Sequence, residues 1–358
     1  MTKLGKIVSS MLLIVALIIG VAFFMYTSSL KAVDTSNNDE VIFEIAEGSF
    51  LNNILVDLEE QELIKSSFAA KIYTKLNPVP SIKFGTYKLS KSMSLKEILD
   101  TFNSGSSFNP NEITVTFIEG LNLKQYQTII DNNFSMTGED FMNEVSSEEF
   151  LKPLIEDYWF LTDEILAEGI FFPLEGYLSP NTYSFTSKDA TSLEIVSTML
   201  EQMESILDPF KDTYQNDQVD SIHQLLTLAS IVELEAVTDE DRQGVAGVFI
   251  NRLEDNTYLG SDVTTYYGVG VLMSERDLYQ YEIDDQNPYN TRNSVVGLPI
   301  GPVSNPSKSS IEASINYTDD DSYFFVSDKN RNIHFTKTYQ EHLKIIAKLK
   351  EEGLWFVW

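Results

Sequence analysis

The stretch Leu228-Ala-Ser-Ile-Val-Glu-Leu-Glu-Ala-Val237 places two carboxylates, Glu233 and Glu235, within an otherwise apolar run. An ionised carboxylate is costly to bury in such surroundings unless it is paired or serves a function. The spacing of apolar residues predicts a long amphipathic helix over residues 221–237. A second helix is expected to begin after an N-cap at Thr238, because acidic residues follow it in the first turn. The two helices should form a hairpin with Glu235 close to the bend.

The two glutamates are not expected to share one small site, because side chains two residues apart point about 200° apart around a helix. Glu233 lies within about 50° of the apolar stripe and Glu235 about 110° from it, at its rim. In a functional interpretation, one of them is an acid whose pKa is raised by desolvation. In a structural interpretation, Glu233 is buried against the backbone or an arginine and Glu235 faces solvent. Periodicity alone does not choose between these interpretations.

The composition restricts the class of protein. A chain of 358 residues with 43% hydrophobic residues is long and apolar enough for two or three folded domains. Its 54 acidic and 25 basic residues give a net charge of -29, which excludes DNA and RNA as expected partners. There is no cysteine, so packing alone must hold the fold. Sequence motifs for metal, nucleotide or organic cofactor sites are absent, and Asp319-Asp-Asp321 lacks the spacing of a calcium loop, so we expect no cofactor.

The N-terminus predicts a membrane anchor. Residues 7–26 are uncharged and mostly apolar, and a run of about 20 such residues suffices to cross a bilayer as a helix. Lys3 and Lys6 precede the run, so residues 1–6 should be cytoplasmic and the rest of the chain outside the membrane. A cleaved signal peptide is the alternative, but its apolar region would be shorter and a small-residue cleavage site would follow. Residues 27–39 are expected to be a polar tether.

The fold class expected for the rest of the chain is mixed α+β, with a mainly helical last domain. A small β-α-α-β-α domain is predicted at 40–105, an intermediate region at 106–219 and a third region at 220–358. Strands are predicted over 41–45, 84–89 and 113–117, helices over 50–63, 66–76, 94–102 and 123–132, mostly helical structure over 135–217, a hairpin of 323–326 with 333–335, and a last helix over 339–352. Residues 171–183, with two prolines, a glycine and four aromatic residues, are interpreted as a surface loop that lines a cleft or as a loop packed on its own aromatic rings.

Two segments strongly resemble the endolytic murein transglycosylases, or YceG-like proteins. One contains Glu233 and Glu235, Ala229-Ser-Ile-Val-Glu-Leu-Glu235, and the other follows it, Val245-Ala-Gly-Val-Phe-Ile-Asn-Arg-Leu253. Other stretches agree with that family in the same order: Phe84-Gly-Thr-Tyr87, Glu175-Gly-Tyr-Leu-Ser-Pro-Asn-Thr-Tyr183, Ser261-Asp262 with Thr264, Tyr289-Asn-Thr291, Gly297-Leu-Pro299, Gly301-Pro-Val-Ser-Asn-Pro306, and 323–326 with His334-Phe335. The resemblance covers nearly the whole chain after the anchor.

The resemblance implies a membrane-anchored enzyme with a LysM-like domain before its catalytic domain. Such an enzyme cleaves the β-1,4 bond between N-acetylmuramic acid and N-acetylglucosamine inside peptidoglycan strands without water, and leaves a 1,6-anhydro end. The second glutamate of the pair, Glu235, carries over as the catalytic acid and base, and Glu233 as a supporting group. Glu235 should then have a pKa above the ordinary value of about 4.3. A wall synthase as partner is expected from the family alone.

Substrate contacts are predicted less sharply, and a structural role is the alternative for each. The candidates are Glu175, Tyr177, Asn181, Asp262, Tyr289, Asn290 and Asn305. The chain departs from the usual family pattern at Ser179, Asn181, Gly260, Val263 and Arg292, all at or near the expected glycan groove. Two other functions stay open at this point: a wall-binding scaffold without catalysis, and a hydrolase that uses water.

Overall fold

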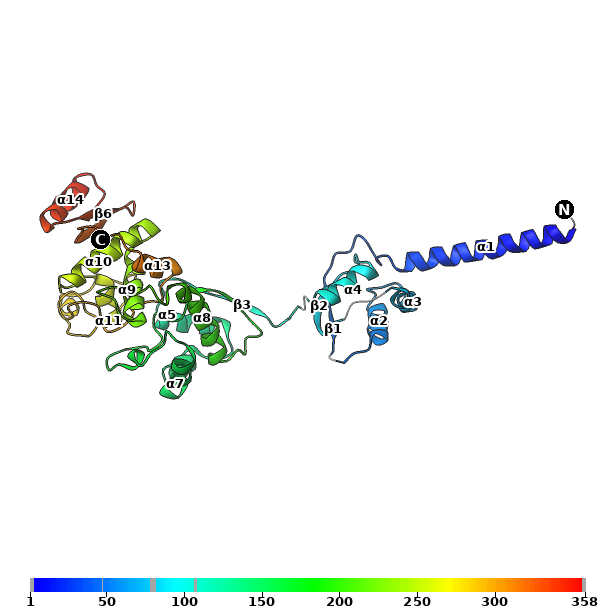
Figure 1. Ribbon diagram of the computed structural model, residues 1–358, viewed down its shortest axis with the longest axis horizontal. Helices are drawn as coiled ribbons and strands as arrows, with labels where there is room; N and C mark the ends of the chain where they lie inside the picture. Colours follow the sequence, from blue (N-terminus) through cyan, green and yellow to red (C-terminus); the bar gives the residue numbers. More distant parts are fainter. Residues whose placement is uncertain (1–2, 47, 78–81, 106–107, 356–358) are drawn as a thin grey trace. The chain divides into compact units, whose positions relative to one another are not determined.

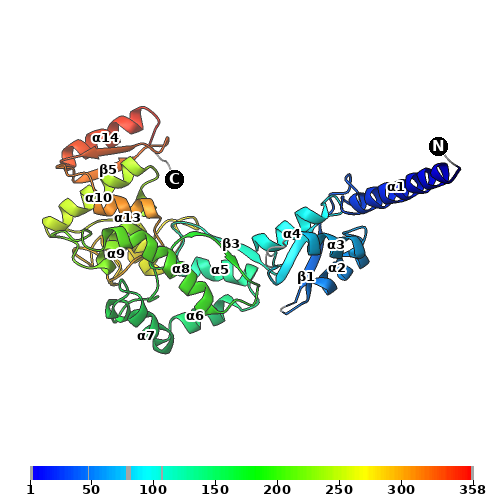
Figure 2. The same cartoon turned by 45° about the vertical axis from the view of Figure 1, so that its right-hand side comes forward.

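Helices and short antiparallel strand pairs make up the computed structural model, which describes residues 3–46, 48–77, 82–105 and 108–355 (Figures 1 and 2). The fold class is mixed α+β, as expected. Within the described residues the strands form three two-stranded sheets, which pair β1 with β2, β3 with β4 and β5 with β6. The chain divides into two units, residues 1–111 and 112–358. The boundary between the expected regions 106–219 and 220–358 is absent, because both contribute to one apolar core.

The first unit begins with the long helix α1 (Lys3–Ser29). Its segment Met11–Ser29 is the one part of the described residues that is long and apolar enough to cross a membrane. The helix runs three residues beyond the expected end at residue 26, and the chain then packs on the unit instead of forming a polar tether. Leu30 packs against the unit's core, its carbonyl accepts a hydrogen bond from Leu95 N at 3.2 Å, and Ala32 is buried. The apolar side chains of residues 30 and 32 explain the difference.

The rest of the first unit has the predicted β-α-α-β-α order. It consists of β1 (Val41–Ile45), α2 (Leu51–Glu60), α3 (Ser67–Leu76), β2 (Gly85–Leu89) and α4 (Leu95–Ser104). Phe43 of β1 lies opposite Tyr87 of β2, and both rings pack with Phe102 of α4 in the core. Helix α2 ends before the predicted residue 63, because Glu62 adopts a left-handed backbone conformation with φ of 57°.

The second unit contains the remaining elements. Its first half consists of β3 (Ile113–Phe117), α5 (Leu123–Asn133), α6 (Gly138–Val145), α7 (Glu148–Asp157), the 3-10 helix η1 (Asp163–Leu166), β4 (Asn181–Phe185), α8 (Ser192–Leu207) and the 3-10 helix η2 (Asp208–Phe210). Its second half consists of α9 (Ile222–Glu235), α10 (Asp239–Glu254), α11 (Asp262–Val269), α12 (Gln280–Ile283), α13 (Lys308–Ile315), β5 (Phe324–Ser327), β6 (Ile333–Thr336) and α14 (Tyr339–Glu351).

Helix α9 lies at the centre of the second unit. It contacts α10, α11 and α13, and every residue from Leu225 to Val232 is buried. The helix is therefore enclosed on all sides, whereas the sequence predicted a single buried stripe. It ends at Glu235, and Thr238 caps α10 by accepting a hydrogen bond from Asp241 N at 3.2 Å. The predicted hairpin of two helices with Glu235 at the bend is confirmed.

The segment 171–183 does not form the predicted surface loop. Leu174, Tyr177 and Leu178 are fully buried in the core of the second unit. The Tyr177 hydroxyl lies 2.9 Å from Nδ1 of His223 on α9, and residues from Asn181 onward form β4, which pairs with β3. Residues 174–179 of the segment are buried because their aromatic and aliphatic side chains pack in the core with α9, which lies far away in the sequence.

Candidate active site

Glu235 is held by a hydrogen bond at the end of α9. Its Oε1 accepts a hydrogen bond from the Ser261 hydroxyl at 2.7 Å. Ser261 occupies the N-cap position of α11, but its side chain makes no capping bond and is directed to the glutamate instead. Ser261 N donates to Thr291 Oγ1 at 3.3 Å, and Ser261 O accepts from Thr264 Oγ1 at 2.9 Å. The donor to Glu235 is therefore itself fixed in place.

Burial is the main influence on the protonation of Glu235. It raises the pKa of Glu235 to about 7, and the nearby Asp262 carboxylate acts in the same direction. The hydrogen bond from Ser261 and the charges of Arg252 and Arg292 act in the opposite direction and limit the rise. Near neutral pH, both the protonated and the ionised form of Glu235 are therefore populated, as a group that first donates and later accepts a proton requires.

The two arginines near Glu235 have other partners of their own. Arg252 on α10 donates to the Tyr323 carbonyl from Nε at 2.8 Å and from Nη2 at 2.6 Å, and its Nη1 donates to the Leu259 carbonyl. Arg292 forms an ion pair with Asp262. No ion pair joins Glu235 to either arginine in the described residues, so the carboxyl group is not locked in its ionised form.

Glu235 lines a cavity of about 330 Å³ together with polar and aromatic side chains. Its other lining residues include Arg252, Ser261, Asp262, Val263, Met273, His342 and residues 324–327. On one wall the Phe324 ring packs 5.5 Å from the ring of His342 and 5.8 Å from that of Tyr339, both on α14. Such aromatic side chains offer flat apolar surface with polar edges, as sugar rings require.

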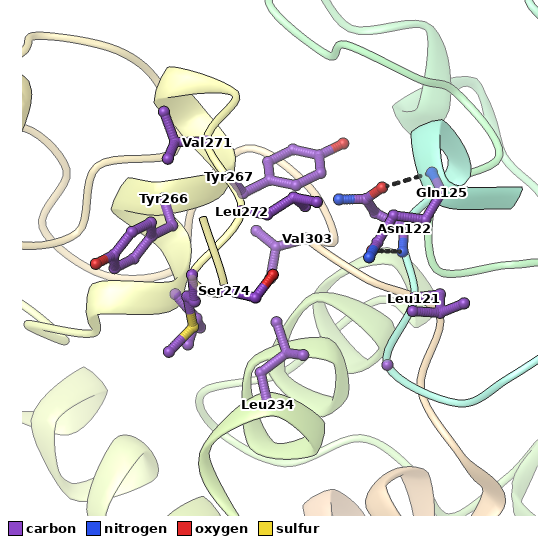
Figure 3. Close-up of a pocket in the computed structure, with 13 residues that line it drawn as sticks. Leu121, Asn122, Gln125, Leu234, Tyr266, Tyr267, Val271, Leu272, Ser274 and Val303 are labelled. Carbon is purple, nitrogen blue, oxygen red and sulfur yellow. Dashed lines mark hydrogen bonds between the residues drawn. The ribbon is translucent and has the colours of Figure 1, made fainter. Parts of the chain in front are cut away.

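A second, more apolar hollow adjoins this cavity, and Figure 3 shows its lining. Val263 and Met273 line both hollows, which are therefore neighbours, and we refer to the two together as the groove. Leu234, Tyr266, Tyr267, Leu272 and Val303 supply most of the second lining, and Asn122 and Gln125 add amide groups (Figure 3). Leu234 directly precedes Glu235, so the bend of the helical hairpin lies along the groove.

Glu233 is buried and fully paired, as the structural interpretation predicted. Its Oε2 accepts hydrogen bonds from Ser307 N at 2.9 Å, from the Ser307 hydroxyl and from the Ser310 hydroxyl at 2.7 Å. Its Oε1 lies 3.4 Å from Arg242 Nη2, and the two side chains are only 7% and 12% exposed. Glu233 thereby ties α9 to α10 and α13 and leaves no oxygen for a substrate. The part of the structural interpretation that placed Glu235 in open solvent is wrong.

Five of the predicted substrate contacts do not face the cavity. Glu175, Tyr177, Tyr289, Asn290 and Asn305 are each at most 1% exposed. Glu175, for example, accepts hydrogen bonds from Leu123 N, the Tyr267 hydroxyl and Asn305 Nδ2, each at 3.1 Å. Burial raises the pKa of Glu175 to about 8. These polar groups are satisfied inside the protein, so they support the fold rather than contact a sugar.

The remaining two predicted contacts are exposed. Asp262 lies at the mouth of the Glu235 cavity, at the start of α11. Asn181 lies elsewhere, in a hollow lined by residues 116–119 and 180–182. Two departures from the family pattern lie at the cavity, because Val263 and Gly260 line it. Gly260 has φ of +64°, a conformation that a residue with a side chain adopts only at a cost.

The site contains residues that the sequence did not predict. Ser261, Arg252 and His342 line the cavity, yet none was among the candidates. In the sequence, Ser261 stood out only as part of a stretch that resembles the family, and its partner Glu235 is 26 residues away. Among the described residues, no group of three or more His, Cys, Asp and Glu side chains could hold a metal ion.

Comparison with known proteins shows which family the chain is similar to. The model of the YceG-like family matches residues 43–348. The endolytic murein transglycosylase of Bacillus subtilis is 33% identical over 333 residues, which are 93% of this chain and 91% of that protein. That of Streptococcus pneumoniae D39 is also 33% identical, over 95% of this chain and 64% of its own length. The crystal structure of a YceG-like protein from Listeria monocytogenes matches with a TM-score of 0.61 and 30% identity, over 86% of this chain and 99% of that one. The chain therefore belongs to the YceG-like family.

Proposed function

We propose that the protein is a membrane-anchored endolytic murein transglycosylase in which Glu235 is the catalytic acid and base. The observation that carries the proposal is the carboxyl group of Glu235, which has a pKa of about 7 and lines a cavity beside a second, apolar hollow. The names of the bacillar and streptococcal relatives support the same reaction class.

In the proposed reaction, protonated Glu235 gives its proton to the glycosidic oxygen as the bond to the anomeric carbon of N-acetylmuramic acid breaks. The ionised Glu235 then takes a proton from the C6 hydroxyl of the same sugar, and the C6 oxygen bonds to the anomeric carbon. The product is a 1,6-anhydro end, and no water is consumed. The hydrogen bond from Ser261 stabilises the carboxylate that forms between the two steps.

Supporting groups have separate parts in this proposal. Glu233 holds the last turn of α9 against α10 and α13 and so positions Glu235. The aromatic wall of Phe324 and His342 and the apolar hollow beside Leu234 would carry sugar rings on either side of the scissile bond. Residues 40–105 would act as a LysM-like domain that binds glycan. Residues 7–26 would anchor the protein in the membrane with its N-terminus in the cytoplasm. Wall synthases would be the partners that supply nascent strands.

A hydrolase is the second candidate, because Asp262 places another carboxylate at the same cavity. It could activate a water molecule where the first mechanism uses the C6 hydroxyl. Its ion pair with Arg292 argues against that role, since the carboxylate is already engaged by a guanidinium group.

The test is digestion of purified peptidoglycan by the full chain in detergent, with products identified by mass spectrometry. Wild type and the control Glu240→Gln, which changes an exposed glutamate in the first turn of α10, should release fragments with anhydro ends. Glu235→Gln should release none. Equal release by Glu235→Gln would remove the assignment of Glu235. No release by any of the proteins would favour a scaffold without catalysis.

A further inference from the structure

The exposed side of α3 combines apolar and basic side chains. The helix buries Ala69 and Ala70 against the first unit, whereas Phe68 and Leu76 are each 72% exposed. Lys71 and Lys75 lie on the same side of the helix as Phe68, because they follow it by three and seven residues, and Leu76 lies about 80° from Phe68 around the helix axis. We call Phe68, Lys71, Lys75 and Leu76, with the half-buried Ile72 between them, the α3 face.

The charge of the α3 face is opposite to that of the protein. The chain carries 54 acidic and 25 basic residues, yet α3 contains two lysines and no acidic residue. One carboxylate approaches it, since Glu59 at the end of α2 bonds to Ser67 and lies near Lys71. Lys75 and both large apolar side chains remain exposed. A short helix with aromatic and aliphatic residues beside lysines is typical of a helix that lies in the surface of an anionic bilayer.

The position of α3 next to α1 points to the same surface. The end of α1 contacts α3, and Leu30 already packs against the core of the first unit. Leu30 follows the end of the apolar run at residue 26 by only four positions, which is about 6 Å along a helix. The headgroup layer on each side of a bilayer is roughly 5 to 7 Å thick. A membrane that holds α1 therefore has its surface beside the first unit.

We propose that the α3 face inserts Phe68 and Leu76 into the outer surface of the membrane and that Lys71 and Lys75 contact its anionic lipid headgroups. The proposal rests on the anchoring of α1 that the proposed function includes. Insertion of this face fixes the first unit on the bilayer by two contacts, the anchor helix and α3.

The absence of native cysteine makes a direct test simple, because any introduced cysteine can be labelled uniquely. We would place a nitroxide spin label at Leu76→Cys or Phe68→Cys in the full chain, reconstituted in phosphatidylcholine vesicles with about one third phosphatidylglycerol. Collisions with oxygen, which concentrates in the bilayer, and with a water-soluble nickel complex report the depth of the label. Ile18→Cys within α1 is the reference for the bilayer, and Leu193→Cys, 53% exposed on α8, is the reference for the second unit.

We expect labels at 68 and 76 to collide more with oxygen than with nickel, close to the Ile18 reference. Lys71→Glu with Lys75→Glu, or vesicles of phosphatidylcholine alone, should shift the labels toward water. Labels at 68 and 76 as accessible to nickel as the label at 193, with the label at 18 immersed, would overturn the proposal and leave the anchor intact. A label at 18 that is also in water would instead contradict the membrane anchor. Immobile labels at 68 and 76 that remain in water would indicate that the α3 face contacts protein, either this chain or a second copy of it, and would overturn insertion.

Discussion

Replacing Glu235 by glutamine should abolish cleavage and at the same time stabilise the second unit at neutral and alkaline pH. The pKa of Glu235 is about 7 in the folded protein and near 4.5 without the surrounding structure. Below pH 4.5 the group is protonated in both the folded and the unfolded state. Between pH 4.5 and 7 only the unfolded state loses the proton, so the contribution of Glu235 to the free energy of unfolding falls as pH rises, and this contribution stops falling above pH 7.

The size of this effect follows from the shift in pKa. A shift from 4.5 to about 7, at about 1.4 kcal/mol per pH unit, corresponds to about 3 kcal/mol. Glutamine does not titrate, and its carbonyl oxygen can still accept the hydrogen bond from Ser261. Glu235→Gln should therefore match wild type near pH 4.5 and exceed it by about 3 kcal/mol at pH 8. This difference in the free energy of unfolding would measure how much the buried carboxylate of Glu235 destabilises the wild-type protein at pH 8.

Urea unfolding monitored by tryptophan fluorescence measures the difference. All three tryptophans, Trp159, Trp355 and Trp358, belong to the second unit, so the signal reports that unit alone. The comparison needs wild type, Glu235→Gln and the surface control Glu240→Gln at pH 5 and pH 8. A constant difference between Glu235→Gln and wild type at both pH values would show that Glu235 titrates normally and would refute the reasoning on its proton.

Three further substitutions test the neighbouring groups. Ser261→Ala should lower kcat about ten- to hundred-fold. It should also move the alkaline limb of the pH–rate profile to higher pH, because the hydrogen bond from Ser261 lowers the pKa of Glu235 and its loss raises that pKa. An unchanged profile would contradict this role of Ser261. Arg242→Met should lower the free energy of unfolding by about 3 kcal/mol, because it leaves Glu233 charged and buried, and adding Glu233→Gln should restore part of the loss; strictly additive effects in urea unfolding would count against the pair. Glu175→Gln should remove the fall in stability between pH 7 and 8 that wild type retains after Glu235 has titrated; a fall that persists in the variant would place the pKa of Glu175 elsewhere.

The helical hairpin could be predicted because its signals are local. Apolar residues recur at helical spacing up to Glu235, and Thr238 is followed by acidic residues that suit a helix start. The enclosure of α9 on all sides could not be read from that spacing. A signal for it was present in small polar residues: the Thr227 hydroxyl donates to the His223 carbonyl at 2.7 Å, and the Ser230 hydroxyl donates to the Thr227 carbonyl at 2.7 Å. Such residues can be buried because they bond to their own helix.

The substrate contacts were harder to predict, because burial in a loop depends on distant partners. Glu175 and Tyr177 lie in a segment rich in proline and glycine, which usually indicates exposure. They are buried because Asn305 and His223, more than 40 residues away, complete their hydrogen bonds. The assignment of Glu235 rested on the family resemblance, since the residues alone left both interpretations open.

Contacts with distant residues also explain why the prediction for residues 27–39 was wrong. Residues 27–39 are polar in composition, and this composition suggested a tether. Two apolar side chains, Leu30 and Ala32, decide otherwise by packing on the first unit. Short polar segments with one or two apolar residues near a domain boundary are thus poor guides to flexibility when the neighbouring core is unknown.

The source of the new bond at the cut end tests the central claim most directly. We would digest peptidoglycan with the full-length protein in oxygen-18 water and weigh the fragments by mass spectrometry. If the C6 hydroxyl of the sugar attacks, as proposed, the new ends are anhydro sugars that contain no heavy oxygen. If water attacks with the help of Asp262, each cut leaves a reducing muramic end that carries one heavy oxygen, and the account of Glu235 as sole acid and base is contradicted.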